Sequence, residues 1–149
     1  MITSIHRPVP SLRCLLADEA EFIDAAFDRI LPETRAEGIR VSASAYVDAK
    51  LAALPARGSA EPSIDLRFYR AGIAEVQALC ERTQGRRFQA LSPWQQLAVL
   101  AQIETPGDAP SSLRRCLLDL LLNDAAEAYF DVVGPSWSQA HEALRAAAA

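Results

Sequence analysis

Residues 64–84 carry apolar side chains at the three- and four-residue spacing of an amphipathic α-helix. Charged residues occupy one side of this helix, and the other side is apolar: Tyr69, Ile73, Val76, Leu79 and Cys80. Gly85 follows directly, and glycine readily adopts the left-handed conformation that ends many helices. A helix of this kind gains most of its stability from packing, so the rest of the chain must supply elements that cover its apolar side.

The other apolar segments have the same helical period. We expect further helices over residues 17–31, 44–54 and 93–104, another from residue 112 towards Gly134, and a last short helix from about Ser138. No stretch alternates apolar and polar residues as a half-buried strand does, and the sequence has no internal repeat. The sequence therefore predicts an all-α fold, a compact bundle of about five to six helices.

The length and composition predict one domain. The chain has 149 residues, half of them hydrophobic, which is enough for a core without metals or disulfides. Residues 55–63 are rich in Ala, Pro, Gly and Ser, but neither flank could close a core alone, so we interpret them as an exposed connector. We place a loose amino-terminal segment at residues 1–15 and a single helical domain at residues 16–145.

Two helix starts carry capping residues. Asp18 followed by Glu21 is typical of a capping box, in which two side chains satisfy amides at the start of a helix. Ser92 and Gln95 have the same spacing around a proline, which is a favoured residue in the first turn. These pairs predict helix starts close to each serine or aspartate.

The apolar spacing also predicts which side chains are buried. In the helix that starts at residue 93 we expect Leu97, Leu100 and Ile103 to face the core. Leucines in the helix from residue 112 spread around most of its circumference, Leu118 and Leu122 included. We therefore expect that helix to be the most buried of all.

The charge balance argues against a nucleic-acid partner. The formal net charge is −4, and binding to phosphates needs clustered Lys and Arg. The longest apolar run, residues 117–122, is too short and too charged to cross a bilayer. Residues 1–10 lack a basic segment followed by an apolar one, so we expect no secretory signal in this sequence.

Residue types that carry enzymatic chemistry are scarce and scattered. His6 and His141 lie near opposite ends of the chain, and the six glycines form no nucleotide-binding motif. Cys14, Cys80 and Cys116 have long, unequal separations and fall on or beside apolar stripes, which favours buried thiols over a metal or disulfide framework. We expect no catalytic, metal-binding or cofactor-binding residue in this chain.

Charged clusters have ordinary explanations. Asp24 and Asp28 lie one helical turn apart and could pair around a metal or a proton, and the doublets Arg86-Arg87 and Arg114-Arg115 could bind an anion or a partner carboxylate. The first helix alternates its acidic residues with its apolar stripe, so we interpret the whole set as a solvated helix face: Glu19, Glu21, Asp24 and Asp28.

Aromatic residues near the carboxyl end raise a different possibility. Tyr129, Phe130 and Trp137 surround a Gly-Pro break, where they are either part of the core or, if exposed, anchors for a partner protein. Trp94, near a helix start, has the same two explanations.

Several short motifs follow one another along the chain: Asp28-Arg29-Ile30-Leu31-Pro32, Gly38 with Tyr46-Val47-Asp48, Tyr69-Arg70-Ala71-Gly72-Ile73, then Gly85, Phe88, Leu91-Ser92 and Gln95-Gln96. Their order resembles the small-subunit family of gluconate 2-dehydrogenase, called subunit 3 or the gamma subunit. The late helix at residues 117–130 is similar too. Residues 134–137, Gly-Pro-Ser-Trp, depart from the tyrosine-glycine-glycine-asparagine loop that is usual in the family.

The resemblance implies a non-catalytic accessory subunit. Its partner would be a large FAD-dependent dehydrogenase of sugars or sugar acids, possibly joined by a cytochrome c subunit, and FAD would be bound by the partner. Many members begin with a twin-arginine export signal, so the resemblance implies a periplasmic or membrane-associated location through the partner; the absence of that signal here leaves a cytoplasmic location open. We predict partner-binding residues at Arg70, Tyr129, Phe130 and Trp137.

Two other functions remain open at this point. One is a cytoplasmic chaperone-like adaptor that releases its partner. The other is a small helical domain that binds a small molecule through Asp24, Asp28 or the arginines.

Overall fold

The computed structural model describes residues 12–31, 43–53, 64–104 and 112–129, and these ranges contain helices and no strand. A further α-helix, at residues 112–129, follows the elements that carry labels: α1 (Ala17–Ile30), α3 (Ala43–Ala53), α4 (Ile64–Gln84), η1 (Phe88–Ala90) and α5 (Pro93–Glu104). The predicted all-α fold is confirmed. The bounds of α1, α3, α4 and α5 differ from the expected ones by no more than one residue, and the helix over residues 112–129 starts where expected.

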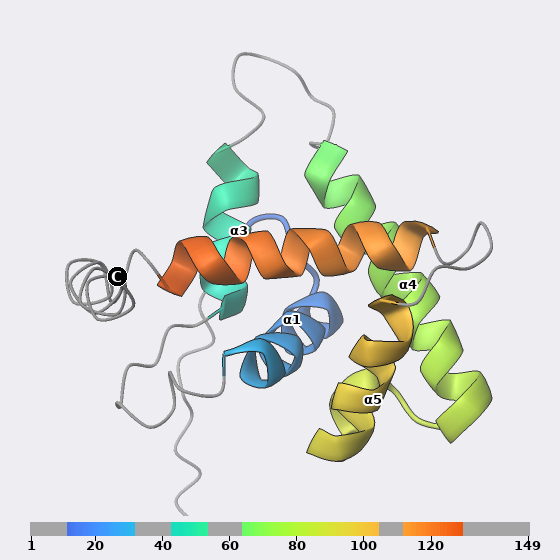
Figure 1. The fold of residues 1–149 in the computed structure, drawn as a ribbon. Helices are drawn as coiled ribbons and strands as arrows, with labels where there is room; N and C mark the ends of the chain where they lie inside the picture. Colours follow the sequence, from blue (N-terminus) through green and yellow to red (C-terminus); the bar gives the residue numbers. More distant parts are fainter. Residues whose placement is uncertain (1–11, 32–42, 54–63, 105–111, 130–149) are drawn as a thin grey trace, which may run out of the picture.

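The helices pack around α1. Figure 1 shows the helix over residues 112–129, in orange, crossing in front of α3 and meeting α4 near its own start, with α1 below it. α4 and α5 lie beside each other, connected through η1, and α1 contacts α3, α4, α5 and η1. The core therefore lies where α1 meets the other elements.

Two phenylalanines mark the centre of this core. Phe22 of α1 and Phe88 of η1 are fully buried, and their ring centroids lie 4.8 Å apart at an interplanar angle of 42°. Tilted aromatic pairs at this separation contribute beyond their buried area. Other fully buried side chains belong to the same core: Ile23, Val47, Tyr69, Val76, Leu117 and Leu121.

The turn between α4 and α5 matches the predicted signals. Gly85 has a φ of +68°, in the left-handed region that glycine tolerates. At the start of α5, the Ser92 amide donates to Gln95 Oε1 at 3.0 Å, and the Gln95 amide donates to Ser92 Oγ at 3.3 Å. Gln95 Nε2 also donates to Gln84 Oε1 at 3.3 Å. The capping box is confirmed, and it joins the end of α4 to the start of α5.

The backbone of Phe88 is held on both sides. Its amide donates to Gln77 Oε1 at 2.8 Å, and its carbonyl accepts from Gln96 Nε2 at 3.1 Å. Gln77 Nε2 in turn donates to Gln89 Oε1 at 2.8 Å. The Phe88 carbonyl also accepts from the Leu91 amide at 3.1 Å. Gln77 therefore supplies the partner of the Phe88 amide, and Gln96 adds a second donor to its carbonyl.

The capping box predicted for α1 is wrong in its residues. Leu16 occupies the N-cap position, and its amide donates to Glu19 Oε1 at 2.8 Å. Asp18 and Glu21 are exposed, and Asp18 Oδ2 instead lies 3.0 Å from Arg87 Nη1. The helix starts where expected because Glu19 lies three residues after the N-cap and accepts from its amide. This is one of the two hydrogen bonds of a capping box.

The burial predicted for α5 is partly wrong. Leu100 and Ile103 are buried as expected, but Leu97 is 42% exposed. Gln96 is buried instead, because its side-chain amide reaches the carbonyl of Phe88. A polar residue therefore occupies a core-facing position on this helix, where the spacing had placed Leu97.

The helix over residues 112–129 is not the most buried one, so that expectation is also wrong. Six of its 18 residues are buried, whereas α1 buries six of 14. Leu118 faces the core, but Leu122 is 43% exposed. Leucines such as Leu122 lie outside the core-facing side of this helix. They made the apolar stripe in the sequence look wider than the face that the other helices cover.

Some expectations lie outside the described residues. These are the arrangements of residues 1–11, of Phe130 and Trp137, and of the short helix from about Ser138. Within the described ranges, every helix is either too short or too polar to cross a bilayer.

Candidate functional site

Polar side chains buried between helices are the most informative feature of the described residues. Each is hydrogen-bonded within the chain, as burial without a partner would be costly. Besides Gln96, these residues are Glu19, Ser44, Asp48 and Asp124.

Asp124, on the helix over residues 112–129, joins three helices through its carboxylate. The hydroxyl of Tyr69, on α4, donates to Asp124 Oδ2, and Lys50 Nζ, on α3, lies 2.6 Å from Asp124 Oδ1. The same ammonium lies 2.7 Å from Glu127 Oε2, which also accepts from the Tyr46 hydroxyl at 3.4 Å. We call Tyr46, Lys50, Tyr69, Asp124 and Glu127 the Asp124 cluster.

Helical spacing explains how the Asp124 cluster assembles. Tyr46 and Lys50 lie four residues apart on α3, and Asp124 and Glu127 lie three apart on their helix, so each pair shares one face. The two faces meet where α3 crosses the last turns of the helix over residues 112–129 (Figure 1). Tyr69 reaches the same carboxylate from α4.

The protonation states in the Asp124 cluster are strongly biased. Burial raises the pKa of Tyr69, and the charge and hydrogen bond of Asp124 raise it further. Burial acts to lower the pKa of Lys50, but the hydrogen bonds and charges of Asp124 and Glu127 outweigh it, so that pKa is raised. The hydrogen bond from Lys50 holds the pKa of Glu127 below its usual range. The cluster is therefore a stable pairing of a cation, two carboxylates and a neutral phenol.

Asp48, also on α3, binds the chain that precedes α1. Its Oδ1 accepts from the amides of Cys14 and Leu15 at 2.8 and 2.9 Å, and its Oδ2 accepts from the amide of Arg13 at 2.9 Å. Burial acts to raise the pKa of Asp48, but these three donors and the Arg13 charge lower it overall. Residues 13–15, at the end of the segment expected to be loose, are thus anchored to the bundle.

Glu19 and Arg70 form a second connection to this segment. Arg70 Nε lies 3.2 Å from Glu19 Oε2, and Arg70 Nη2 donates to the carbonyl of Cys14 at 2.8 Å. Glu19 is buried although it belongs to the helix face that we expected to be solvated. That expectation is wrong for Glu19 because α4 brings an arginine over the first turn of α1.

Asp24 departs from the same expectation. Its carboxylate accepts from the amide and the hydroxyl of Ser44, at 2.9 and 3.0 Å, and so caps the first turn of α3. Asp24 is half-buried and committed to a helix start. It is therefore not available for the metal or acid-base pair considered with Asp28. Among the described residues, no group of His, Cys, Asp and Glu has an arrangement suited to a metal ion.

Gly72 allows α4 and the helix over residues 112–129 to approach closely. A Cβ atom at this position would lie 2.5 Å from Leu117 Cβ and 3.1 Å from the carbonyl oxygen of Leu113. No side chain larger than hydrogen fits without moving one helix. Tyr69, Arg70 and Gly72 thus make three separate contacts from one helical turn.

The thiols are free and differ in their surroundings. Cys80 is buried, as expected, while Cys14 and Cys116 are half-buried. Burial, and less strongly the charge of Glu81, raises the pKa of the Cys80 thiol to about 11. A thiol with so little thiolate at neutral pH is a poor nucleophile.

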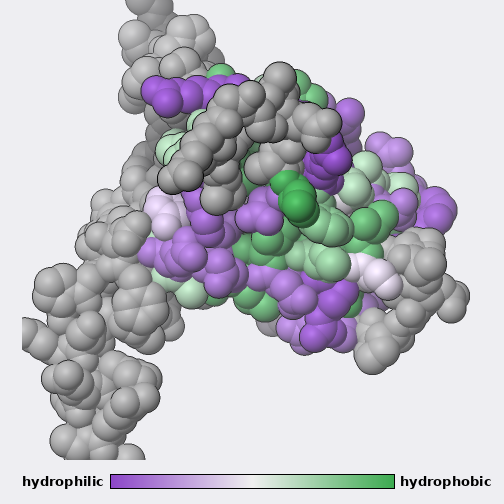
Figure 2. All heavy atoms as spheres, turned by 90° about the horizontal axis from the view of Figure 1, so that it is seen from above, coloured by the Kyte–Doolittle hydropathy of each residue, from purple (hydrophilic) through white to green (hydrophobic). Residues whose placement is uncertain are grey.

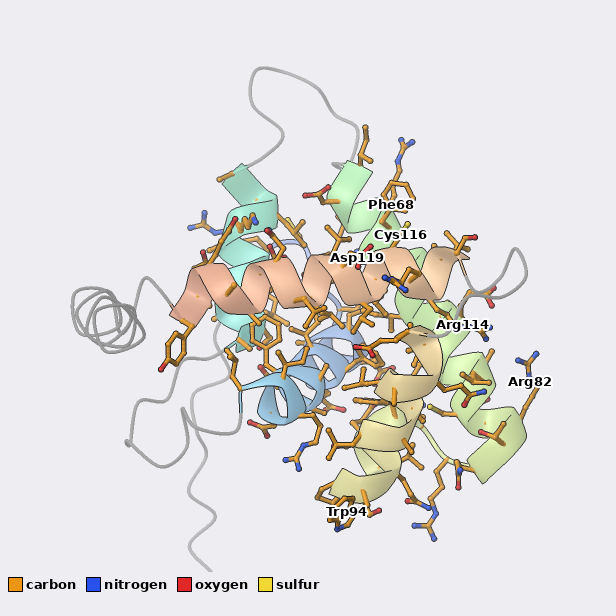
Figure 3. The ribbon with its side chains drawn as sticks, in the orientation of Figure 1. Phe68, Arg82, Trp94, Arg114, Cys116 and Asp119 are labelled. Carbon is orange, nitrogen blue, oxygen red and sulfur yellow. The ribbon has the colours of Figure 1, made fainter. Side chains whose placement is uncertain are left out.

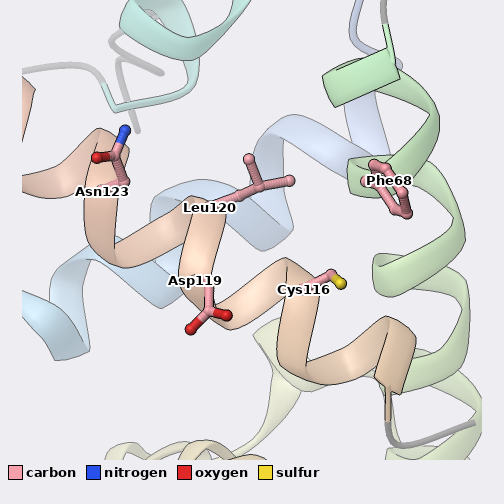
Figure 4. Close-up of a pocket in the computed structure, with 5 residues that line it drawn as sticks. All are labelled: Phe68, Cys116, Asp119, Leu120 and Asn123. Atoms are coloured by element: carbon pink, nitrogen blue, oxygen red, sulfur yellow. The ribbon is translucent and has the colours of Figure 1, made fainter.

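Large apolar side chains are exposed at six described positions, and two outward apolar features involve them. A shallow depression of about 290 Å³ lies between α4 and the helix over residues 112–129, lined by Phe68, Cys116, Asp119, Leu120 and Asn123. Figure 4 shows Cys116 and Leu120 pointing towards the side of Phe68, and Asp119 pointing away from it. Figure 2 shows apolar side chains gathered in a band on the upper face, with hydrophilic residues on both sides.

Trp94 is the second outward apolar feature. It is 82% exposed at the start of α5, and Figure 3 shows it pointing away from the bundle. Of the two explanations that the sequence allowed for Trp94, core or surface, the structure places it on the surface.

The predicted partner-binding residues do not form one site in the described chain. Arg70 is half-buried and engaged with Glu19 and Cys14, and Tyr129 is half-buried at the end of the helix over residues 112–129. Phe130 and Trp137 lie outside the described residues. Partner binding by these four residues stays a prediction.

Sequence reasoning missed the Asp124 cluster and the Asp48 anchor. Their partners are separated by tens of residues, so no local spacing connects them. One signal was available: Asp48 and Asp124 interrupt apolar helix faces, and a buried carboxylate needs a partner.

No curated protein and no solved structure matches the chain. The sequence profile of gluconate 2-dehydrogenase subunit 3 matches residues 17–132, a range that contains every described helix. This range covers more than three quarters of the chain and includes Tyr69, Arg70, Gly72 and Asp124. The chain therefore belongs to the gluconate 2-dehydrogenase subunit 3 family.

Proposed function

We propose that this chain is a non-catalytic small subunit that binds a large FAD-dependent dehydrogenase and supports its maturation, export or stability. The family is named for a subunit of gluconate 2-dehydrogenase. This name supports the proposal of a partner that acts on sugars or sugar acids. FAD belongs to that partner in this proposal, and a cytochrome c subunit is the proposed electron acceptor.

The observation that carries the proposal is the set of contacts made by one turn of α4, from Tyr69 to Gly72. Tyr69 donates to Asp124, Arg70 holds Glu19 and the chain before α1, and Gly72 admits the neighbouring helix. The segment that most resembles the family is therefore occupied with internal contacts. Residues used in this way support a scaffold whose function lies on its surface.

The protonation states inside the bundle favour the same conclusion. A general base or nucleophile needs a pKa near the working pH. Lys50 is held as a cation, Tyr69 as a neutral phenol and Cys80 as a thiol, because the pKa of each is raised. These groups are suited to holding helices together.

Co-purification from the native cell tests the proposal. The full chain, carrying an affinity tag, is expected to retain a protein with bound FAD that oxidises gluconate or a related sugar acid in the presence of an artificial electron acceptor. The chain purified alone is expected to lack this activity. Retention of no flavoprotein, or oxidation by the isolated chain, would overturn the proposal.

A chaperone-like adaptor is the second candidate. The exposed Trp94 and Leu97 favour an adaptor as much as they favour a permanent subunit, because both need an apolar surface for a partner. An adaptor releases its partner after folding or export, whereas a subunit stays bound. A pulse-chase experiment separates the two: the flavoprotein remains with the tagged chain for a subunit and leaves it for an adaptor.

The location follows the partner in this proposal. We expect the chain at the periplasmic face of the membrane or in the periplasm when it is bound, with a cytoplasmic pool as the alternative. Fractionation of cells with and without the large subunit distinguishes them, because only a partner-dependent location changes when that subunit is removed.

A further inference from the structure

Helix α5 has an apolar face that nothing in the described chain covers. Its buried face contains Val99, Leu100 and Ile103. On the opposite side, four exposed residues follow the spacing of a helical stripe: Trp94, Leu97, Ala98 and Ala101. We call these four residues the α5 outer face. Trp94 is 82% exposed and Leu97 is 42% exposed, so the two largest side chains of the stripe are in contact with water.

The composition of α5 is that of an interface core. No charged residue occurs between Pro93 and Ile103. Single exposed apolar residues are ordinary on a protein surface, but the centres of interfaces are depleted in charge and enriched in Trp and Arg. A tryptophan at the end of an uncharged stripe is a combination typical of a binding anchor.

The start of α5 is held rigidly. Ser92 and Gln95 form its capping box, Gln95 is bonded to Gln84 at the end of α4, and Gln96 binds the carbonyl of Phe88. Trp94 is therefore displayed from a fixed helix end. Binding through it costs less conformational entropy than binding through a loop residue would.

The edge beside Trp94 is basic although the whole chain is acidic. Residues 81–87, the end of α4 and its turn, contain three arginines and one glutamate, while the chain has a formal net charge of −4. Arg87 is paired with Asp18, but within the described ranges Arg86 has no ion pair and is exposed. The bond between Gln84 and Gln95 brings this turn next to the first turn of α5. A complementary partner would therefore present an apolar surface bordered by carboxylates.

We propose that the α5 outer face is the docking surface for the large dehydrogenase subunit, with Trp94 inserted into an apolar pocket of that subunit and Arg86 facing a carboxylate at its edge. This inference rests on the proposed function, since that function supplies the partner. The stripe from residue 94 to residue 101 is only about 11 Å long. A stable interface needs roughly 800 Å² from each partner, so the stripe is the anchor of a larger contact area.

A second copy of this chain fits less well. Two copies with a net charge of −4 each repel one another, whereas a partner with an acidic border is attracted to the basic edge at Arg86. Phe68, on α4, lies far from Trp94 in Figure 3 and provides a matched control. Phe68 is 39% exposed, so replacing it removes an aromatic group without opening the core.

The test compares full-length tagged chains purified from the native cell. The variants are Trp94→Ser, Leu97→Ser and Arg86→Glu, with Phe68→Ser as the control. The readouts are FAD per chain and gluconate oxidation in the retained fraction, together with the melting temperature of each chain alone. We expect Trp94→Ser to weaken association at least about 30-fold, the effect of removing a hot-spot residue, and Phe68→Ser to leave it unchanged. All variants are expected to melt within a few degrees of the wild type.

Hydroxyl-radical footprinting of the wild-type complex provides a readout without substitutions. Oxidation of Trp94 is expected to fall several-fold on complex formation, while oxidation of Phe68 stays at the level of the free chain.

The outcomes are distinguishable. If the wild type retains the flavoprotein and Trp94→Ser retains it equally well, the docking surface is wrong and the proposed function stands. If the wild type retains no flavoprotein, the proposed function itself fails. Loss of binding with Phe68→Ser but not with Trp94→Ser would place the contact at the depression beside α4. A wild-type chain that is dimeric alone, and monomeric with Trp94→Ser, would identify a second copy as the occupant and overturn the proposal.

Discussion

The hydroxyl of Tyr69 donates a hydrogen bond to the buried carboxylate of Asp124, 55 residues later in the chain. This bond joins α4 to the helix over residues 112–129 close to where Gly72 lets the two helices approach. The polar contact and the close packing therefore secure the same crossing.

Tyr69→Phe tests the polar half of that crossing. The variant keeps the buried ring but removes one donor from a buried carboxylate, so we expect a loss of about 1–3 kcal/mol in the free energy of unfolding. Urea denaturation measures it. Tyr46→Phe is the matched control, because its hydroxyl contact with Glu127 is longer, at 3.4 Å, and exposed. A control loss as large as that of Tyr69→Phe would contradict the role given to Asp124.

Gly72→Ala tests the packing half. The new Cβ would lie 2.5 Å from Leu117 Cβ, so the helices must separate. Overpacking of this kind costs about 1–3 kcal/mol, which outweighs the gain of up to about 1 kcal/mol in helix propensity. Leu117→Ala in the same chain should not restore stability, because alanine keeps the clashing Cβ atom. A stabilised Gly72→Ala variant in thermal unfolding would show that the crossing is loose.

Lys50→Met tests the ion pair of the Asp124 cluster. The change leaves a buried carboxylate without its cation, and full removal of a buried partner costs roughly 3–5 kcal/mol. Because the Lys50 side chain is 26% exposed, water relieves part of this penalty, and we expect about 1–3 kcal/mol. The control is Arg87→Met, whose pair with Asp18 is more than half exposed on both sides. That control should leave the free energy of unfolding close to that of the wild type, because solvent screens an exposed pair.

Asp48 makes stability depend on pH in a predictable direction. Its pKa is lower in the folded chain than the ordinary value of 3.8, so its contribution is present at neutral pH and disappears as the pH falls through the folded pKa. Asp48→Asn removes the charge and turns an amide NH2 towards backbone donors. We therefore expect the variant to be less stable at pH 7, with a gap to the wild type that narrows below about pH 4.

The measurement is the denaturant midpoint of the wild type and of Asp48→Asn between neutral and acid pH. It shows whether the stability gap narrows in acid, and Asp119→Asn is the exposed control. A gap that widens in acid would contradict the anchoring of residues 13–15 by the Asp48 carboxylate.

The helices were predictable because their signals are local. The stripe from Tyr69 to Cys80 and the glycine at position 85 lie within one segment, so spacing alone gave α4 its bounds. Ser92 and Gln95 likewise carry their own geometry. Periodicity reports which residues share a face, and for these elements that information was sufficient.

The polar contacts were not predictable because each depends on packing. Glu19 resembles any acidic residue on a helix face until α4 places Arg70 over it, and Asp24 resembles its neighbours until α3 places Ser44 beside it. Leu97 was misplaced for a related reason: Gln96 faces inwards and binds the carbonyl of Phe88, while Leu97 beside it faces outwards. These choices depend on which helices meet, which a single sequence does not state.

Lys50 is the only lysine in the chain, and its side-chain nitrogen lies between two carboxylates. Reagents that acylate amines therefore have a single side-chain target, and the raised pKa leaves little of the neutral amine on which their reaction depends. Acylation at this atom would also remove the positive charge that Asp124 requires. Amine-directed labelling, surface immobilisation and cross-linking would thus proceed slowly at this position, and where they succeeded they would loosen the contact among three helices.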